Sequence, residues 1–234
     1  MRLRREALAV AAALALVLSG CTPTASPAVP DVQDFEFDTF HAQLILLRDG
    51  DGGSTLRTIE TMTAIFPEED QNRGIVRTIE TYPSADLVGF EMIGVTDGAG
   101  TRRPFEIEQT QNVVTIVVAV PEGEFVHGEQ TYEITYQRRE VIDAYSEVQH
   151  FATDVNGVGW AQPFGTVTAD LELVGDLATA VYNEPFCYVR TEYGDPDFEC
   201  DVTGGEGFYQ AVQTDLEPGE TLHFYLEFQP GTFR

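Results

Sequence analysis

Histidines and carboxylates are the residues of this chain best suited to catalysis, and they form no recognisable catalytic motif. The four histidines, His41, His127, His150 and His223, lie far apart, and there is no H-E-x-x-H or H-x-H pair. The chain also lacks the G-x-S-x-G and S-x-x-K sequences of serine nucleophiles. We therefore expect no catalytic residue, no metal site and no cofactor. A hydrolase built on two carboxylates needs no local motif, so it stays an alternative without positive support.

The stretch RDGDGGS raises the question of calcium, because Asp49 and Asp51 are hard oxygen ligands in a glycine-rich loop. An EF-hand loop needs a third ligand two residues further on, where this chain has Gly53. Glycines at this spacing supply the positive φ angles that a hairpin turn requires. We interpret the stretch as a turn, and weak calcium binding at Asp49 and Asp51 stays open.

Acylation of a thiol is the one modification that the sequence indicates. Three arginines precede an uncharged apolar stretch at residues 7–18, which is shorter than the roughly 20 residues that span a bilayer. This order is typical of a secretory signal peptide. The residues LSGC at positions 18–21 resemble the bacterial lipoprotein box, in which the cysteine receives a diacylglycerol group and the chain is cut just before it. The resemblance implies a cleaved signal peptide at residues 1–20 and a membrane anchor on Cys21. An ordinary signal peptide with an incidental cysteine is the alternative.

Residues 21–34 are rich in proline, threonine and serine and show no apolar period. We interpret them as a flexible tether that leads to a single domain at residues 35–234.

The charge of the chain excludes one class of partner. The net charge is −26, and removal of residues 1–20 takes away three arginines and one glutamate, which leaves −28. Such a chain repels phosphate backbones, so we expect no nucleic-acid partner.

Two further cysteines, Cys187 and Cys200, enclose a short acidic segment. Outside the cytoplasm such a pair is expected to be oxidised. The spacing differs from the C-x-x-C of redox and zinc motifs. We predict a structural disulfide between them.

The pattern after residue 35 predicts strands throughout. Segments such as TYEITYQ and ETLHFYLEF alternate apolar and polar residues, and VVTIVVAV at positions 113–120 reads as a buried strand. Turn signals recur about every 8–12 residues, which favours an all-β antiparallel sandwich. A Greek-key or Ig-like strand order fits this pattern. Residues 176–184, DLATAVYNE, are the only short helix candidate.

Two residue types stand out on these strands. Trp160 is the only tryptophan, and we interpret it as a packing anchor rather than a ligand platform, with a surface role as the alternative. Arg73 and Arg77 form a basic spot in an acidic chain, and we expect a buried or paired arginine there.

Several short segments, taken together, resemble a known family. The segments are collinear and cover nearly all of residues 35–233: RGIVRTIE (73–80), YEITYQ (132–137), FATDVNGVGWAQPFGTVTADLEL (151–173), the two cysteines, and LEPGETLHFYLEFQPGTF (216–233). They are similar to the extracytoplasmic N-terminal domain of a family of predicted bacterial membrane proteins of unknown function. The resemblance implies a β-sandwich on the outer face of a membrane, and it implies no activity. Those relatives continue into transmembrane helices, for which the Cys21 anchor would substitute here.

We therefore expect a lipid-anchored, extracytoplasmic module that binds a protein or a glycan of the cell envelope. The alternatives are a passive accessory of a membrane protein complex and a hydrolase of envelope polymers. An enzyme should show a cleft with converging carboxylates of raised pKa. A binding module should show an exposed apolar or aromatic patch.

Overall fold

The computed structural model describes residues 34–80, 89–110, 113–191 and 198–234. These residues form fifteen strands and one short 3₁₀ helix, so the predicted all-β fold is confirmed. Within the same residues, no helix is both long and apolar enough to cross a membrane. The predicted signal peptide, Cys21 and the tether up to residue 33 lie outside the described residues.

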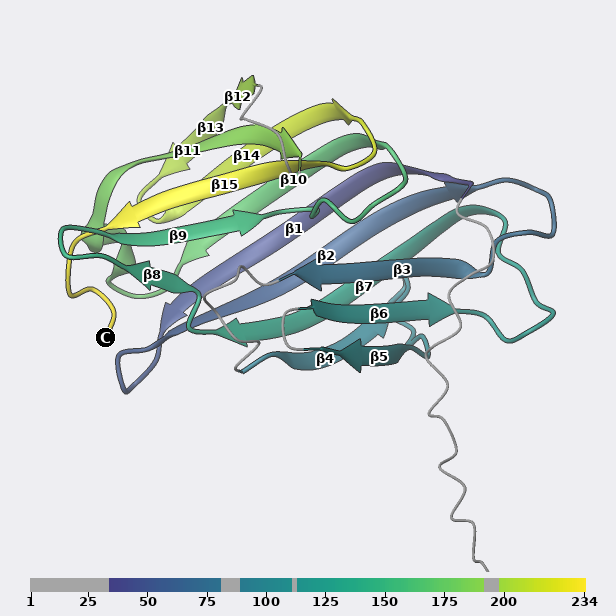
Figure 1. Ribbon diagram of the computed structural model, residues 1–234, viewed down its shortest axis with the longest axis horizontal. Coiled ribbons are helices and arrows are strands. Elements are labelled where there is room, and N and C mark those ends of the chain that lie inside the picture. Colours follow the sequence, from purple (N-terminus) through teal and green to yellow (C-terminus); the bar gives the residue numbers. More distant parts are fainter. Residues whose placement is uncertain (1–33, 81–88, 111–112, 192–197) are drawn as a thin grey trace, which may run out of the picture.

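A seven-stranded sheet forms the back layer in Figure 1. Its strand order is β13 (Val202–Gly205), β14 (Phe208–Leu216), β10 (Phe164–Leu173), β1 (Glu36–Arg48), β2 (Ser54–Phe66), β7 (Gly128–Arg139) and β4 (Glu91–Thr96).

Two smaller sheets lie side by side over one face of this large sheet (Figure 1). The five-stranded sheet has the order β12 (Phe198–Cys200), β11 (Val181–Thr191), β15 (Glu220–Phe228), β9 (Gln149–Asp154) and β8 (Ile142–Ala144). The three-stranded sheet has the order β3 (Gly74–Glu80), β6 (Val113–Ala119) and β5 (Glu106–Gln109). The front layer therefore consists of two separate sheets, whereas each layer of an Ig-like sandwich is a single sheet.

Alternation along the strands produces one core between the layers. In β7 the buried residues are Tyr132, Ile134 and Tyr136, with less buried polar residues between them, as the sequence predicts. The apolar run of β6 buries four of its seven residues. The predicted hairpin is also present, because β1 and β2 pair antiparallel from Arg48–Ser54 outward. Apart from Val117 of β6, the buried apolar residues named here belong to one continuous apolar cluster.

The strand pairs are antiparallel as predicted, with one exception in the described residues, because β1 runs parallel to β10. The preceding strand β9 belongs to the five-stranded sheet, so the chain crosses to the other layer before β10 begins. A crossover of this kind returns the chain in the same direction, whereas a tight hairpin reverses it. The helix candidate at residues 176–184 is a 3₁₀ helix only over Leu177–Ala180, after which β11 begins.

Candidate functional site

A cleft of about 450 Å³ lies where the three-stranded and five-stranded sheets meet. The residues that line it come from β3, β7, β8, β9, β11 and β15 and from the loop that follows β9. A volume of this size falls within the range of small-molecule binding sites. The cleft is therefore the candidate functional site.

A buried ion pair fixes one wall of the cleft to the back sheet. Arg77 of β3 donates hydrogen bonds from Nε and Nη2 to the two carboxylate oxygens of Glu60, at 2.8 and 2.6 Å. Tyr136 donates from its hydroxyl to Glu60 Oε1 at 2.8 Å. Burial disfavours the charge on Arg77, but the Glu60 carboxylate outweighs it and raises the pKa of the guanidinium. The sequence-based expectation of a buried, paired arginine is thus confirmed for Arg77.

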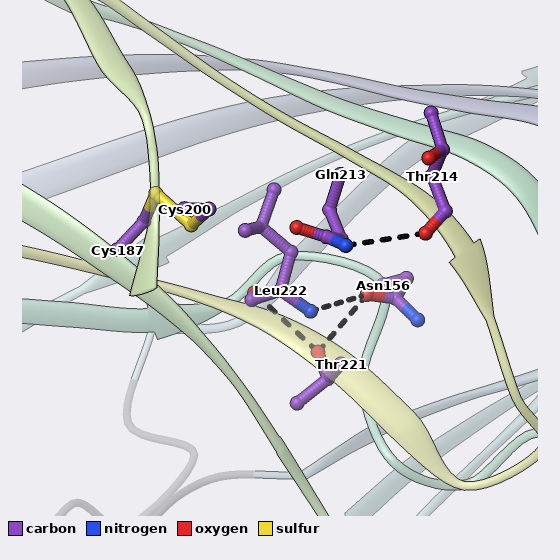
Figure 2. Close-up of a disulfide and its surroundings, with 7 residues drawn as sticks. All are labelled: Asn156, Cys187, Cys200, Gln213, Thr214, Thr221 and Leu222. Atoms are coloured by element: carbon purple, nitrogen blue, oxygen red, sulfur yellow. Dashed lines mark hydrogen bonds between the residues drawn. A yellow bond between two sulfur atoms is a disulfide. The ribbon is translucent and has the colours of Figure 1, made fainter. Parts of the chain in front are cut away.

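The loop after β9 is held by Asn156, which is fully buried. Its Oδ1 accepts hydrogen bonds from the backbone N–H of Leu222 and from the hydroxyl of Thr221, each at 3.0 Å (Figure 2). Its backbone carbonyl accepts hydrogen bonds from Arg77 Nη1 and Trp160 Nε1, each at 2.7 Å. One asparagine therefore connects β15, β3 and the loop that borders the cleft.

Glycine is required immediately after this asparagine. Gly157 has φ +79°, a backbone conformation that other residues rarely adopt. A Cβ atom at this position would also lie only 2.8 Å from Arg77 Nη1. A substitution here would displace the arginine or the loop, and either change alters the wall of the cleft.

The other side of the cleft carries a charged trio. Asp154 on β9 accepts hydrogen bonds from Arg190 on β11 and lies 2.8 Å from Nδ1 of His223 on β15. Burial opposes ionisation of this carboxyl, but the hydrogen bonds from His223 and Arg190 outweigh it, so the pKa of Asp154 lies below its ordinary value. Asp154 is thus held as an anion between two donors.

Rings cover the same outward face of the five-stranded sheet, because alternate residues of a strand point to one side. Neighbouring ring centroids are 4.6 Å apart for Phe186 and Tyr225, 4.7 Å for Tyr188 and His223, and 5.1 Å for His150 and Tyr225. Two members are largely exposed, with Tyr145 at 59% and Phe186 at 47%. We call this set the aromatic shelf; it consists of Tyr145, His150, Phe186, Tyr188, His223 and Tyr225.

Arg138 of β7 is the cation in the cleft with the weakest pairing. Its Nη2 lies 3.4 Å from the hydroxyl of Thr153, and its Nε is buried without a hydrogen-bond partner. Within the described part of the chain, no carboxylate forms an ion pair with Arg138. This contrasts with Arg77 and Arg190, which both pair with a carboxylate.

Trp160, the residue singled out in the sequence, packs behind the cleft rather than in it. Its side chain is buried, at 5% exposure, and its ring meets Phe37 edge-on at 4.8 Å. Its indole N–H donates a hydrogen bond to the backbone carbonyl of Asn156. The structure thus places Trp160 as support for the loop that lines the cleft.

The two late cysteines, Cys187 and Cys200, form a disulfide between β11 and β12 (Figure 2). Their Cα atoms are 5.3 Å apart, within the ordinary range for disulfides. Cys187 is buried, at 1% exposure, and it alternates with the shelf residues Phe186 and Tyr188 along β11. The disulfide therefore links the edge strand β12 covalently to β11, which carries part of the aromatic shelf.

The aspartates considered for calcium serve the β1–β2 turn. The Asp49 carboxylate accepts a hydrogen bond from the hydroxyl of Thr55 at 2.9 Å, and Asp51 Oδ1 accepts one from the backbone N–H of Gly53 at 3.3 Å. Arg234 also approaches Asp51. Across the described residues, no group of three histidine, cysteine, aspartate or glutamate side chains gathers as a metal site would require.

Apart from Arg77, sequence reasoning did not identify the cleft residues as a site, although one signal for them existed. The segment TLHFYLEF places His223, Tyr225 and Glu227 on the solvent side of β15, where polar residues without aromatic rings are more usual. The partners Asp154 and Arg190 come from strands distant in sequence, so no local spacing connects them. Only the order of strands in the sheet brings them together.

These features define an all-β domain with a polar and aromatic cleft on its front layer. A family model described as "Predicted membrane protein (DUF2207) N-terminal domain" matches residues 37–228. The chain belongs to this family, as the collinear segments suggested, and the family is one of predicted membrane proteins.

No curated protein matches the chain. Solved structures with some likeness include an M1 zinc metallopeptidase from Deinococcus radiodurans and a putative protease from Parabacteroides distasonis. The first is 12% identical over 81% of this chain with a TM-score of 0.38, and the second is 13% identical over 87% with a TM-score of 0.43. This chain spans only 42% and 41% of those two chains. Likeness at this level carries no argument about function.

Proposed function

We propose that this chain is an extracytoplasmic binding module of the cell envelope that is anchored to the membrane through Cys21. The observation that carries the proposal is the cleft of about 450 Å³, where the aromatic shelf, Arg138 and the Asp154 trio converge. A few placed polar groups beside aromatic surface are the usual composition of a recognition site. Membership of a predicted membrane protein family supports placement at a membrane.

The state of Asp154 does not suit this carboxyl to the role of general acid in a hydrolase. A carboxyl that acts as a general acid needs a raised pKa, so that it still carries its proton near neutral pH. The pKa of Asp154 is instead lowered by its two donors. This carboxylate is therefore suited to accept hydrogen bonds from a ligand and to orient the donors around it.

The anchor is tested separately from the cleft. We expect labelled palmitate to enter the full-length protein and Cys21→Ser to release it from the membrane fraction, because two or more acyl chains give a stable anchor. If Cys21→Ser stays in the membrane fraction as the wild type does, the proposed anchor is wrong. This result would not bear on the cleft, which a separate experiment tests.

The cleft is tested by site-specific photocrosslinking in cells that carry the full chain. A photoreactive residue at Ala152, which is exposed and lines the cleft, should give crosslinked adducts. The matched position is Arg57, an exposed residue of β2 on the opposite layer, which should give none. Tyr225→Ala should abolish the adducts at Ala152. Equal adducts at the two positions, or none at Ala152, would refute a binding role for the cleft.

A further inference from the structure

The cleft holds one arginine, Arg138, that forms no ion pair in the described residues, although the carboxylates Glu80 and Asp143 also line the cleft. The chain has 39 acidic and 13 basic residues, and three of the arginines line this one cleft. Two of the three are neutralised by Glu60 and Asp154, whereas Arg138 has no carboxylate partner in the described residues. A guanidinium with free donors binds a carboxylate through two parallel hydrogen bonds. The unpaired state of Arg138 thus points to an anionic group on the ligand at this position.

The aromatic shelf defines the rest of the ligand. Tyr188, Tyr225 and His223 line the same cleft as Arg138, and Phe186 continues the surface outward. A pyranose ring has a flat face of C–H groups that packs on an aromatic ring, and its rim carries hydroxyls. The carboxylate of Asp154 and the Nε2 atom of His223 are the polar groups of this cleft that a sugar hydroxyl would meet, because Nδ1 of His223 already faces Asp154.

Where β11 and β15 carry Tyr188 and Tyr225, each has hydrogen-bonded neighbours on both sides, so a peptide cannot add a strand there, although β3 and β8 are sheet edges beside the cleft. β15 is hydrogen-bonded to β11 and β9, and β11 is hydrogen-bonded to β15 and β12. Strand addition requires a free sheet edge. Recognition over the shelf therefore depends on side chains, which suits a ring-shaped polar ligand better than an extended backbone.

We infer that the cleft binds a saccharide that carries a carboxylate, with a sugar ring on Tyr225 and Tyr188 and the carboxylate on Arg138. The inference rests on the proposed function and names the ligand class of that site. The general acidity of the chain repels a long polyanion, so short segments with one carboxylate in the cleft are the expected ligands.

The test uses the full-length protein in detergent and isothermal titration with acidic oligosaccharides. The probes are a galacturonate trimer, a hyaluronan tetrasaccharide and a disaccharide that contains N-acetylmuramic acid, each beside its carboxyl-reduced counterpart. At least one acid should bind about tenfold or more tightly than its reduced form, because a charge-assisted bidentate pair is lost on reduction. Arg138→Gln and Tyr225→Ala should each weaken the acid by about tenfold or more. Arg57→Gln, an exposed arginine on the other layer, removes the same charge and should leave binding unchanged.

Three results would overturn the inference. The first is that no acid binds more tightly than its reduced form, and the second is that Arg138→Gln and Arg57→Gln bind alike. The third is that an acidic peptide such as triglutamate binds more tightly than all of the saccharides. In each case, adducts at Ala152 in cells would still support the proposed binding role, so the two failures are distinguishable. Thermal unfolding detects whether Arg138→Gln fails to fold. In that case Arg138→Lys serves as the second variant, because it keeps the charge but not the bidentate geometry. Its affinity for the acid should lie between that of the wild type and no binding.

Discussion

The pair Glu60–Arg77 is the most consequential contact at the scale of single residues. Both side chains are almost completely buried, at 0% and 3% exposure, and Tyr136 and Asn156 complete their hydrogen bonds. Removal of one partner leaves a buried charge without compensation, which costs about 3–5 kcal/mol. We therefore expect Glu60→Gln to lower the free energy of unfolding by about that amount, measured by urea denaturation.

The double variant Glu60→Leu, Arg77→Met is the control for this prediction. It removes both charges together, and apolar residues of similar size often restore the stability lost by breaking a buried pair. It should be clearly more stable than Glu60→Gln alone. A loss below about 1 kcal/mol in Glu60→Gln would show that the pair is not the main link between β3 and the back sheet.

Asp154 gives the fold a defined dependence on pH. Its pKa is lowered in the folded state, so its contribution to stability is complete above its unfolded pKa of about 3.9 and is lost as the pH falls through the folded value. Asp154→Asn should therefore be less stable than wild type near pH 6, and the difference should shrink below about pH 3.5. Urea denaturation at several pH values measures this. Asp38→Asn, at an exposed position of β1, should show no such convergence. A difference that stays constant with pH would contradict the role assigned to Arg190 and His223.

At the scale of elements, the two copies of RTIET show what the sequence could and could not specify. Residues 57–61 in β2 bury Thr58 and Glu60, whereas the same letters in β3 bury Arg77 and Ile79. The copies are therefore out of phase by one residue, which exchanges the faces of a strand. Alternation predicted that both are strands, but the face that each buries is set by neighbouring sheets. The ion pair between Glu60 of the first copy and Arg77 of the second could not be predicted from the sequence of either copy.

The same reasoning separates the predictable parts of the fold from the rest. Local alternation and turn glycines were sufficient for β1, β2, β6, β7 and β15, because each strand carries its own pattern. The parallel β1–β10 pair and the division of the front layer depend on crossovers between sheets, which leave no local trace. The cleft forms at that division, so it was beyond sequence reasoning for the same reason.

The disulfide between β11 and β12 allows a prediction about how much this contact contributes to stability. The disulfide closes a loop with a sequence separation of 13, which corresponds to about 3 kcal/mol in the chain-entropy model. We expect the double variant Cys187→Ala, Cys200→Ala to lose about that much stability in urea. Dithiothreitol should lower the stability of the wild type similarly and leave the double variant unaffected. An effect of the reductant on the double variant would mean that it acts elsewhere.

For the molecule as a whole, the core runs from one end of the predicted domain to the other. Phe35 is buried at 8% exposure and lies 4.5 Å from the ring of Phe66, and Phe233 near the other end is buried at 5%. The apolar cluster includes all three of these residues. Phe35 is the first core residue of the described part of the chain, and the domain boundary at residue 35 stays a prediction.

This boundary predicts that residues 35–234, exported to an oxidising compartment without Cys21, fold cooperatively and remain soluble. The fragment keeps the whole described core and the disulfide. Within this fragment, Phe37→Ala should lower the free energy of unfolding by about 3–5 kcal/mol, because the ring is buried and stacks on Phe164 at 4.8 Å. Thr39→Ala, an exposed neighbour on β1, should change it by less than about 0.5 kcal/mol. Failure of the fragment to unfold in a single transition, or equal effects of the two substitutions, would mean that residues before 35 are part of the folded unit.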